Sequence, residues 1–254
     1  SLYSRRYQAP VLYENPAGGM FPMLPLANRV AGNRFIFQGR EIVLPRHHAD
    51  AHFFLHGDGW LQRWDMIARG GDYCVLQLRR QHACGFDYLA QIRYQLLRNQ
   101  LVAALTLTHC GSMPIPYGCG FHPFFPFYKR STVQFVAAGY WPEGEQHLPL
   151  GWQGQLPGYA DFSHAQYGED RWLNVGYSGW SGRARVSSGV MDITILSQTP
   201  WLMLFRMQGE PFLCLEPQSH PVNAHNMDGQ PGLRVLGAGD TLSFSLKIDV
   251  QGRE

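Results

Sequence analysis

A histidine and a glutamate, each surrounded by apolar residues, are the groups in this chain best suited to acid–base chemistry. His122 lies between aromatic residues and is followed by Pro123. Glu216 is predicted to end an apolar strand, because the following Pro217 cannot continue a central ladder. An imidazole exchanges protons near neutral pH, and apolar surroundings raise the pKa of a carboxyl group toward values useful for a general base. The plainer alternatives are a core histidine bonded to a backbone carbonyl and a glutamate that points into solvent at a strand end.

Two other polar groups stand in rigid surroundings and are candidates for binding a ligand. Arg29 follows Asn28 between apolar residues, and His56 opens the run HGDGW, which ends at Trp60. The two glycines of this run let a ligand approach the backbone closely. Alternatively, Arg29 is a solvated side chain at an exposed turn, and His56 is a partly buried residue of a tight turn.

A metal site is the competing interpretation of the histidines. His47, His48, His52 and His56 are close in sequence, and the last two would share one face of a helix. The metalloprotease pattern requires a glutamate directly after the first histidine of such a pair, and Phe53 stands there. We therefore expect no metal ion at these histidines.

The segments that must position these groups have the pattern of β-strands. Apolar residues alternate with polar ones over 241–250, which predicts a strand with one buried face. The segment 87–108 predicts two strands joined near 98–100, and two further hairpins are predicted over 34–45 and 183–196.

The distribution of glycine and proline along the chain favours a single all-β domain over residues 1–254. The 28 glycines and 17 prolines are spread along the whole sequence, which is typical of a sandwich or barrel of short strands. No amphipathic helix of useful length is evident. The segments 111–130 and 140–170 are rich in glycine, proline and aromatic residues, and we expect them to be long ordered loops that carry sites.

Composition excludes several classes of partner. The formal net charge is only +2 and charged residues make up 16% of the chain, so we expect neither nucleic acid nor a membrane surface as partner. The five cysteines form no CxxC pair, which favours a reducing cytoplasm. Strand edges leave room for a homodimer, so both a monomer and a homodimer are compatible with the sequence.

Five stretches, taken together, resemble the aldose 1-epimerase (galactose mutarotase-like) family in order and in rough spacing. They correspond to the family's N-R segment, its H-G-x-G-W and H-P-[YF]-F motifs, its L-D-N-x-F-x-G-W-x-G segment and its E-P-x-[ST] segment. In this chain they read PLANRVAGNRFIFQG at 25–39, LHGDGW at 55–60, GFHPFFPF at 120–127, LNVGYSGWSGRARV at 173–186 and LEPQSHPVNAHN at 215–226.

The resemblance implies a fold, a reaction and a set of site residues. The fold would be a β-supersandwich of large antiparallel sheets, with the site in a concave groove. The reaction would be the interconversion of the α and β anomers of a free hexose, with Glu216 as general base, His122 as general acid and no metal or other cofactor. The resemblance further implies that the substrate is bound by Arg29, His56, Trp60, Asn174 and Gln218.

Departures from the family pattern keep other functions open. Asn174 stands where the family usually has an aspartate, and an amide carries no charge and adds a hydrogen-bond donor. One alternative is a sugar-binding or sugar-sensing protein without catalysis. Another is a hexose-6-phosphate 1-epimerase, for which Lys129 and Arg130 are the candidate phosphate ligands. A glycoside hydrolase is disfavoured, because that chemistry usually needs two carboxyl groups.

Overall fold

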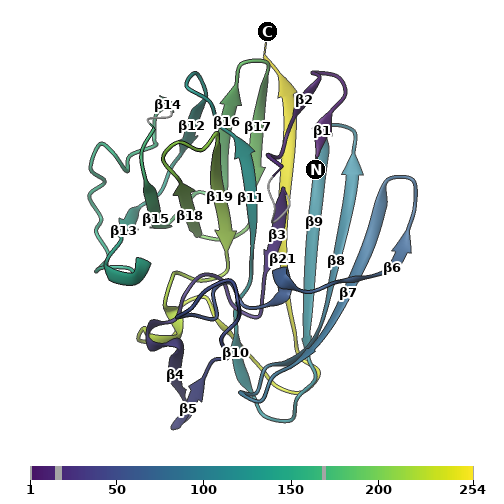
Figure 1. Ribbon diagram of the computed structural model, residues 1–254, viewed down its shortest axis with the longest axis vertical. Coiled ribbons are helices and arrows are strands. Elements are labelled where there is room, and N and C mark those ends of the chain that lie inside the picture. The colour runs from purple at the N-terminus through teal and green to yellow at the C-terminus, as the bar shows by residue number, and fades with distance from the viewer. Residues whose placement is uncertain (1, 15–18, 168–169, 254) are drawn as a thin grey trace.

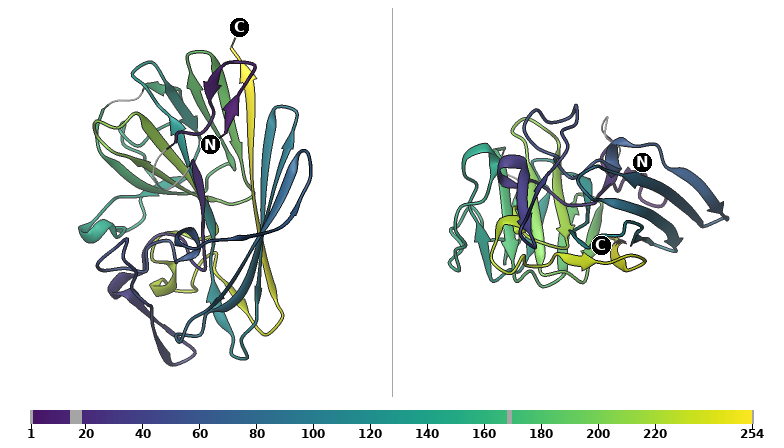
Figure 2. Two further views of the ribbon diagram at one scale, coloured as in Figure 1. Left: turned by 45° about the vertical axis from the view of Figure 1, so that its right-hand side comes forward. Right: turned by 90° about the horizontal axis from the view of Figure 1, so that it is seen from below.

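A computed structural model describes residues 2–14, 19–167 and 170–253 of the chain. Within these residues two large antiparallel sheets lie against each other (Figures 1 and 2). The smaller sheet has six strands in the order β13 (Gly139–Trp141), β15 (Leu173–Ser178), β18 (Trp201–Arg206), β19 (Phe212–Gln218), β11 (Gly120–Pro126) and β3 (Met20–Met23).

The larger sheet has nine strands within the described part of the chain. Its strands β6 to β8 extend away from the rest of the molecule at one side (Figure 2). Its order is β14 (Gln166–Tyr167), β12 (Thr132–Phe135), β16 (Arg183–Ser188), β17 (Met191–Leu196), β21 (Thr241–Gly252), β9 (Gln100–His109), β8 (Asp87–Leu97), β7 (Tyr73–Gln81) and β6 (Asp65–Arg69).

Short elements fill the ends of the sandwich. Three two-stranded sheets pair β1 (Tyr3–Ser4) with β2 (Ala9–Pro10), β4 (Arg34–Phe37) with β5 (Arg40–Val43), and β10 (Ile115–Tyr117) with β20 (Arg234–Leu236). The described helices are single 3₁₀ turns: η1 (Ala31–Asn33), η2 (Gly59–Leu61), η3 (Glu145–His147) and η4 (Ala224–Asn226). In the described part of the chain, none of them has the length and apolar character that crossing a membrane requires.

The main core lies between the two sheets and follows from strand alternation. In β21, Leu242, Leu246 and Ile248 are buried, whereas the residues between them point mostly to the outside. In β19, Leu213 and Leu215 belong to the same core. The alternate residues of β19 therefore project from the opposite face of the six-stranded sheet, and that face carries the candidate site.

The all-β class and the predicted hairpins are confirmed, and two local predictions are wrong. The segment 111–130 is not a loop, because it contains β10 and β11, and His122 lies on β11. Strand β19 does not end at Glu216 but continues through Pro217 to Gln218. Pro217 is accommodated because it is aligned with Leu202 of β18, and the ladder between β19 and β11 is interrupted at this level.

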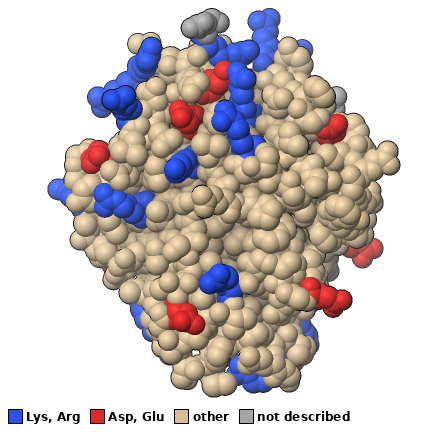
Figure 3. Space-filling view, turned by 180° about the vertical axis from the view of Figure 1, so that it is seen from behind, with Lys and Arg blue, Asp and Glu red and all other residues tan. Residues whose placement is uncertain are grey.

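The outer surface is sparsely charged. Seen from the back, most of the surface is uncharged, and Lys and Arg side chains lie among Asp and Glu side chains (Figure 3). This distribution agrees with the low content of charged residues, 16% of the chain.

Candidate active site

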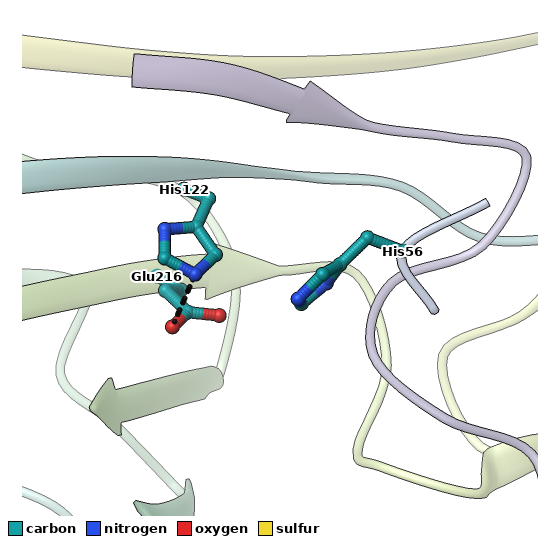
Figure 4. A group of neighbouring side chains, drawn as sticks. All are labelled: His56, His122 and Glu216. Carbon is teal, nitrogen blue, oxygen red and sulfur yellow. Dashed lines mark ion pairs between the residues drawn. The ribbon is translucent and has the colours of Figure 1, made fainter. Parts of the chain in front are cut away.

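A histidine–glutamate pair lies at the centre of the outer face of the six-stranded sheet. Strands β11 and β19 pair antiparallel, and the register that sets Phe124 opposite Cys214 also sets His122 opposite Glu216. Opposite residues of an antiparallel pair project from the same face with their Cβ atoms about 4.5–5.5 Å apart. The His122 Nε2 atom accordingly lies 3.1 Å from Glu216 Oε1 (Figure 4).

Burial controls the protonation of this pair. Both side chains are almost completely buried. Loss of solvation lowers the pKa of His122 to about 3 and raises the pKa of Glu216 to about 8, because it disfavours the charged form of each. The two groups therefore hold one proton between them at neutral pH. The positive charge of Arg29 opposes the shift of Glu216 and favours its carboxylate form.

His56 faces this pair from the loop between β5 and η2. One nitrogen of His56, one of His122 and a carboxylate oxygen of Glu216 lie within 4.8 Å of one another (Figure 4). The Nδ1 atom of His56 accepts a hydrogen bond of 3.1 Å from the Asn28 N–H. Burial lowers the pKa of His56 well below its usual value, so the ring is neutral and its Nε2 carries the hydrogen. His56 is therefore a hydrogen-bond donor.

The loop that carries His56 is locked against the chain after β3. Gly57 has φ +66°, and a Cβ atom there would lie 2.0 Å from the Leu24 carbonyl oxygen. Behind it, the buried carboxylate of Asp58 forms an ion pair with Arg80 and contacts His82. These contacts attach the HGDGW loop to the larger sheet and fix the position of His56.

Arg29 enters the site from the segment that follows β3. This segment is held by the Ala27 N–H, which donates to His220 Nε2 at 3.1 Å, and by the Asn223 N–H, which donates to the Arg29 carbonyl at 2.9 Å. The Nε atom of Arg29 is buried and has no hydrogen-bond partner among the described residues. The guanidinium group therefore has unused donors at the site.

A pocket of about 270 Å³ joins these groups. Its polar lining includes Arg29, His56, His122 and Glu216, and its remaining surface is predominantly apolar. Phe21 stacks on His122, with ring centroids 4.5 Å apart, and Trp60 stacks on Phe21. The aromatic residues of the lining are Phe21, Trp60, Phe124, Trp172 and Phe205.

The far wall of the pocket is formed by Asn174, Trp172 and His147. Asn174 lies on β15, opposite Phe205 of β18. Its Nδ2 atom donates a hydrogen bond of 2.6 Å to Glu143 Oε1. Trp172 Nε1 donates to the other oxygen of the same carboxylate at 2.7 Å.

The predicted residues converge, with one exception. Arg29, His56, Trp60, Asn174 and the pair of His122 and Glu216 all line the pocket. Gln218 is buried and instead lines a small adjoining hollow, which it shares with Asn174. Its predicted contact with a substrate remains a prediction.

Several lining residues were not predicted from the sequence. Phe21 and Phe205 alternate with core residues on buried strands, and this pattern does not distinguish a pocket from a core. His147 and Trp172 lie in or just after the segment 140–170 that we expected to carry a site, but no motif singles them out. The exposed Lys129 and Arg130 are not among the described residues that line the pocket.

The triad of His56, His122 and Glu216 also has the residue types of a metal site. The hydrogen bond from Asn28 to His56 Nδ1 leaves the hydrogen on Nε2. A metal ion at Nε2 would have to displace that hydrogen. The arrangement therefore fits a proton-transfer site better than a metal centre.

Comparison with known proteins agrees with this geometry. The family model for aldose 1-epimerase matches residues 8–249 of the chain. The curated protein YphB of Escherichia coli (strain K12), which is uncharacterised, is 35% identical over 244 residues, covering 91% of this chain and 83% of YphB.

Solved structures share the fold. A crystal structure of an Escherichia coli K12 protein, assigned only provisionally as an aldose 1-epimerase, has a TM-score of 0.92 and 32% identity, covering 96% of this chain and 90% of its own. Galactose 1-epimerase from Lactobacillus acidophilus NCFM has a TM-score of 0.73 at 17% identity, covering 99% of this chain and 82% of its own, a likeness of fold.

Proposed function

The chain belongs to the aldose 1-epimerase family, and on this premise we propose that it interconverts the α and β anomers of a free aldose. The observation that carries the proposal is the buried pair of His122 and Glu216, 3.1 Å apart, in a pocket that also contains the donors of Arg29 and His56. The isomerisation requires one acid, one base and no external co-reactant, and this site supplies both groups.

Ring opening moves two protons in opposite directions. Glu216, as carboxylate, removes the proton of the C1 hydroxyl, while His122, as imidazolium, protonates the ring oxygen. The bond between C1 and the ring oxygen breaks, and C1 becomes an aldehyde carbon. The pair holds one proton before this step, on His122, and one proton after it, on Glu216.

Ring closure reverses these transfers after rotation about the C1–C2 bond. The ring oxygen attacks the other face of the aldehyde and returns its proton to His122. Glu216 returns its proton to the oxygen on C1. Because the pair begins and ends with the same proton, neither solvent nor a cofactor has to supply one. One positioned proton-transfer group contributes about 10²–10⁴ in rate.

Arg29 and His56 support the charged arrangement of the pair. The resting proton belongs to Glu216, because burial raises its pKa to about 8. Transfer of that proton to His122 creates the reactive carboxylate and imidazolium without changing the net charge. The guanidinium of Arg29 favours the carboxylate, and the Nε2–H of the neutral His56 is available to a sugar oxygen.

The lining favours an unphosphorylated sugar. Arg29 is the one Lys or Arg among the described residues that line the pocket, and Glu216 lies close to it. Aromatic rings cover much of the remaining surface, and apolar rings pack well against the C–H faces of a pyranose.

Glu216→Gln tests the proposal. We expect the variant to lose at least about 10²-fold in the rate of anomer exchange, because an amide cannot accept the proton of the C1 hydroxyl. The rate is measured by polarimetry or by NMR exchange of the anomeric protons of D-glucose and D-galactose. Glu41→Gln, an exposed change on β5, is the matched control.

Full activity of Glu216→Gln with an intact fold would reject the role of Glu216. Binding of hexoses by the wild-type protein without accelerated exchange would instead identify a sugar-binding protein and reject the enzymatic proposal.

A further inference from the structure

One carboxylate organises the far wall of the pocket. Glu143 lies in the segment between β13 and η3, and it accepts hydrogen bonds from Asn174 Nδ2, Trp172 Nε1 and His147 Nδ1. These donors lower the pKa of Glu143, although partial burial opposes the shift. The three donor residues line the pocket that contains Glu216, whereas Glu143 lies behind them.

The carboxylate determines which atoms these side chains present. An ionised carboxylate only accepts hydrogen bonds, so the Asn174 amide must turn its NH₂ group toward Glu143. No described residue donates to its Oδ1 atom, which is left to accept from a ligand. By the same argument the hydrogen between His147 and Glu143 belongs to the Nδ1 atom of His147, which donates it to the carboxylate.

The pocket therefore has opposite hydrogen-bonding character on its two sides. Arg29 and His56 provide N–H donors beside the catalytic pair. Asn174 provides an acceptor from β15, which is separated by β18 from the strand that carries Glu216. A sugar hydroxyl can serve either side, whereas a phosphate or carboxylate oxygen can serve only the donors.

We propose that Glu143 is a positioning and specificity-determining residue, which orients Asn174 as a pure acceptor and selects neutral sugars that direct a hydroxyl group toward Asn174. This inference rests on the proposed function only for the identity of the sugar. Asn174, held in this way, accepts as an aspartate would, but the negative charge lies one side chain farther from the ligand.

Glu143→Gln is the first variant that tests the proposal. A glutamine has a single acceptor oxygen for three donors, so the Asn174 amide is no longer held in one orientation. We expect the Kd for D-glucose or D-galactose to rise roughly tenfold, as the loss of one well-made hydrogen bond implies. KM should rise by a similar factor, with a smaller change in kcat. Glu145→Gln on η3 is the matched control, since Glu145 is exposed.

Asn174→Asp gives the decisive comparison. In the wild-type background the new carboxyl group of residue 174 faces the carboxylate of Glu143, in place of the hydrogen bond of 2.6 Å between Asn174 Nδ2 and Glu143 Oε1. Because the two carboxylates repel each other, we expect weaker sugar binding, most strongly at high pH. In the Glu143→Gln background the glutamine NH₂ can donate to the new aspartate. We expect the double variant to bind within about threefold of the wild type, and a merely structural role of Glu143 would give no such rescue.

Binding is measured by isothermal titration with D-glucose, D-galactose and D-glucose 6-phosphate, and exchange is measured separately by NMR. We expect the phosphorylated sugar to bind more weakly than D-glucose. A double variant as weak as the single variants, or a wild-type protein that binds neither free hexose, would overturn the proposal. If the binding pattern holds but exchange is not accelerated, the enzymatic function fails while the role of Glu143 stands.

Discussion

The reacting groups share one proton because burial penalises the charge of both. A buried imidazolium or a buried carboxylate alone would be costly, but a neutral acid beside a neutral imidazole avoids both costs. Glu216 Oε1 and His122 Nε2 lie only 3.1 Å apart, so direct transfer of the proton between these two atoms produces the reactive form. The same proton then moves between enzyme and sugar, so the number of protons on the pair decides whether the site is active.

The pH dependence of kcat/KM follows from this count. Above the pKa of Glu216, raised by burial to about 8, the pair loses its proton and no acid remains for the ring oxygen. Below the lowered pKa of His122, about 3, the pair gains a second proton and no base remains. We expect kcat/KM to be steady near neutral pH and to fall tenfold per pH unit well above pH 8, after subtraction of the uncatalysed exchange. An activity that rises continuously from pH 7 to 10 would contradict this assignment.

At the scale of single residues, the sequence predicts those site residues whose own type and sequence neighbours indicate a functional role. His56, His122 and Glu216 stand beside glycines, prolines or aromatic residues that mark ordered surroundings, whereas Arg29 follows Asn28 between apolar residues. Glu143 also stands beside a proline and a glycine, but no motif singles it out, and a glutamate in a loop has the pattern of a solvated side chain. Its role depends on three donors brought together from other positions, and only the fold reveals it.

At the scale of elements, two strands and one loop set the geometry. The register between β11 and β19 sets His122 opposite Glu216, and the HGDGW loop directs His56 toward them. Strands β11 and β19 are each hydrogen-bonded to a neighbouring strand on both sides. The loop depends instead on close backbone packing at Gly57 and on the ion pair of Asp58 with Arg80.

Gly57→Ala should therefore displace the loop. The new Cβ atom would lie 2.0 Å from the Leu24 carbonyl oxygen at a residue with φ +66°, so the backbone must move. We expect a loss of about 2–4 kcal/mol in the free energy of unfolding and at least a tenfold loss in kcat/KM, measured by urea denaturation and NMR exchange. Gly71→Ala is the control, because a Cβ atom there meets nothing within 4 Å. Equal behaviour of the two variants would show that the loop does not position His56.

The strands differ in how far sequence could predict them. Alternation over 241–250 predicts β21 because one of its faces is buried and the other is exposed. Strand β11 is buried on both faces, so no alternation marks it, and its glycine and prolines imitate a loop. Pro217 similarly suggests the end of β19, although the ladder is interrupted only on the side of β11.

The whole molecule buries one face of the six-stranded sheet in its core and uses the other for the pocket. Burial of polar groups extends beyond the pocket, since His220 and His225 are also enclosed where the ends of the sheets meet the loop of Arg29. Loss of solvation lowers the pKa values of His56, His122, His220 and His225, to about 4 for His220. All four imidazoles are therefore neutral in the folded protein at neutral pH.

Stability should fall steeply on acidification for this reason. Unfolded histidines have pKa values of about 6.5, so below that pH the unfolded chain binds protons that the folded chain excludes. Glu216 has the opposite effect on the free energy of unfolding between about pH 4.3 and its raised pKa of about 8, because there the folded chain holds a proton that the unfolded chain has lost. This single group does not offset the four histidines. We expect maximal stability at about pH 7 and a loss of about 2–4 kcal/mol per pH unit below pH 6, measured by urea denaturation at a series of pH values.

His225→Leu separates this effect from general acid sensitivity. The variant removes one enclosed imidazole that packs against Phe35, and the slope of stability against pH below pH 6 should decrease by up to about 1.4 kcal/mol per unit. His48→Leu is the matched control and should keep the wild-type slope, because His48 is exposed in the folded protein as in the unfolded chain. A wild-type stability that stays constant from pH 7 to 5 would show that the enclosed histidines accept protons in place, which would also undermine the neutral state assigned to His56 at the site.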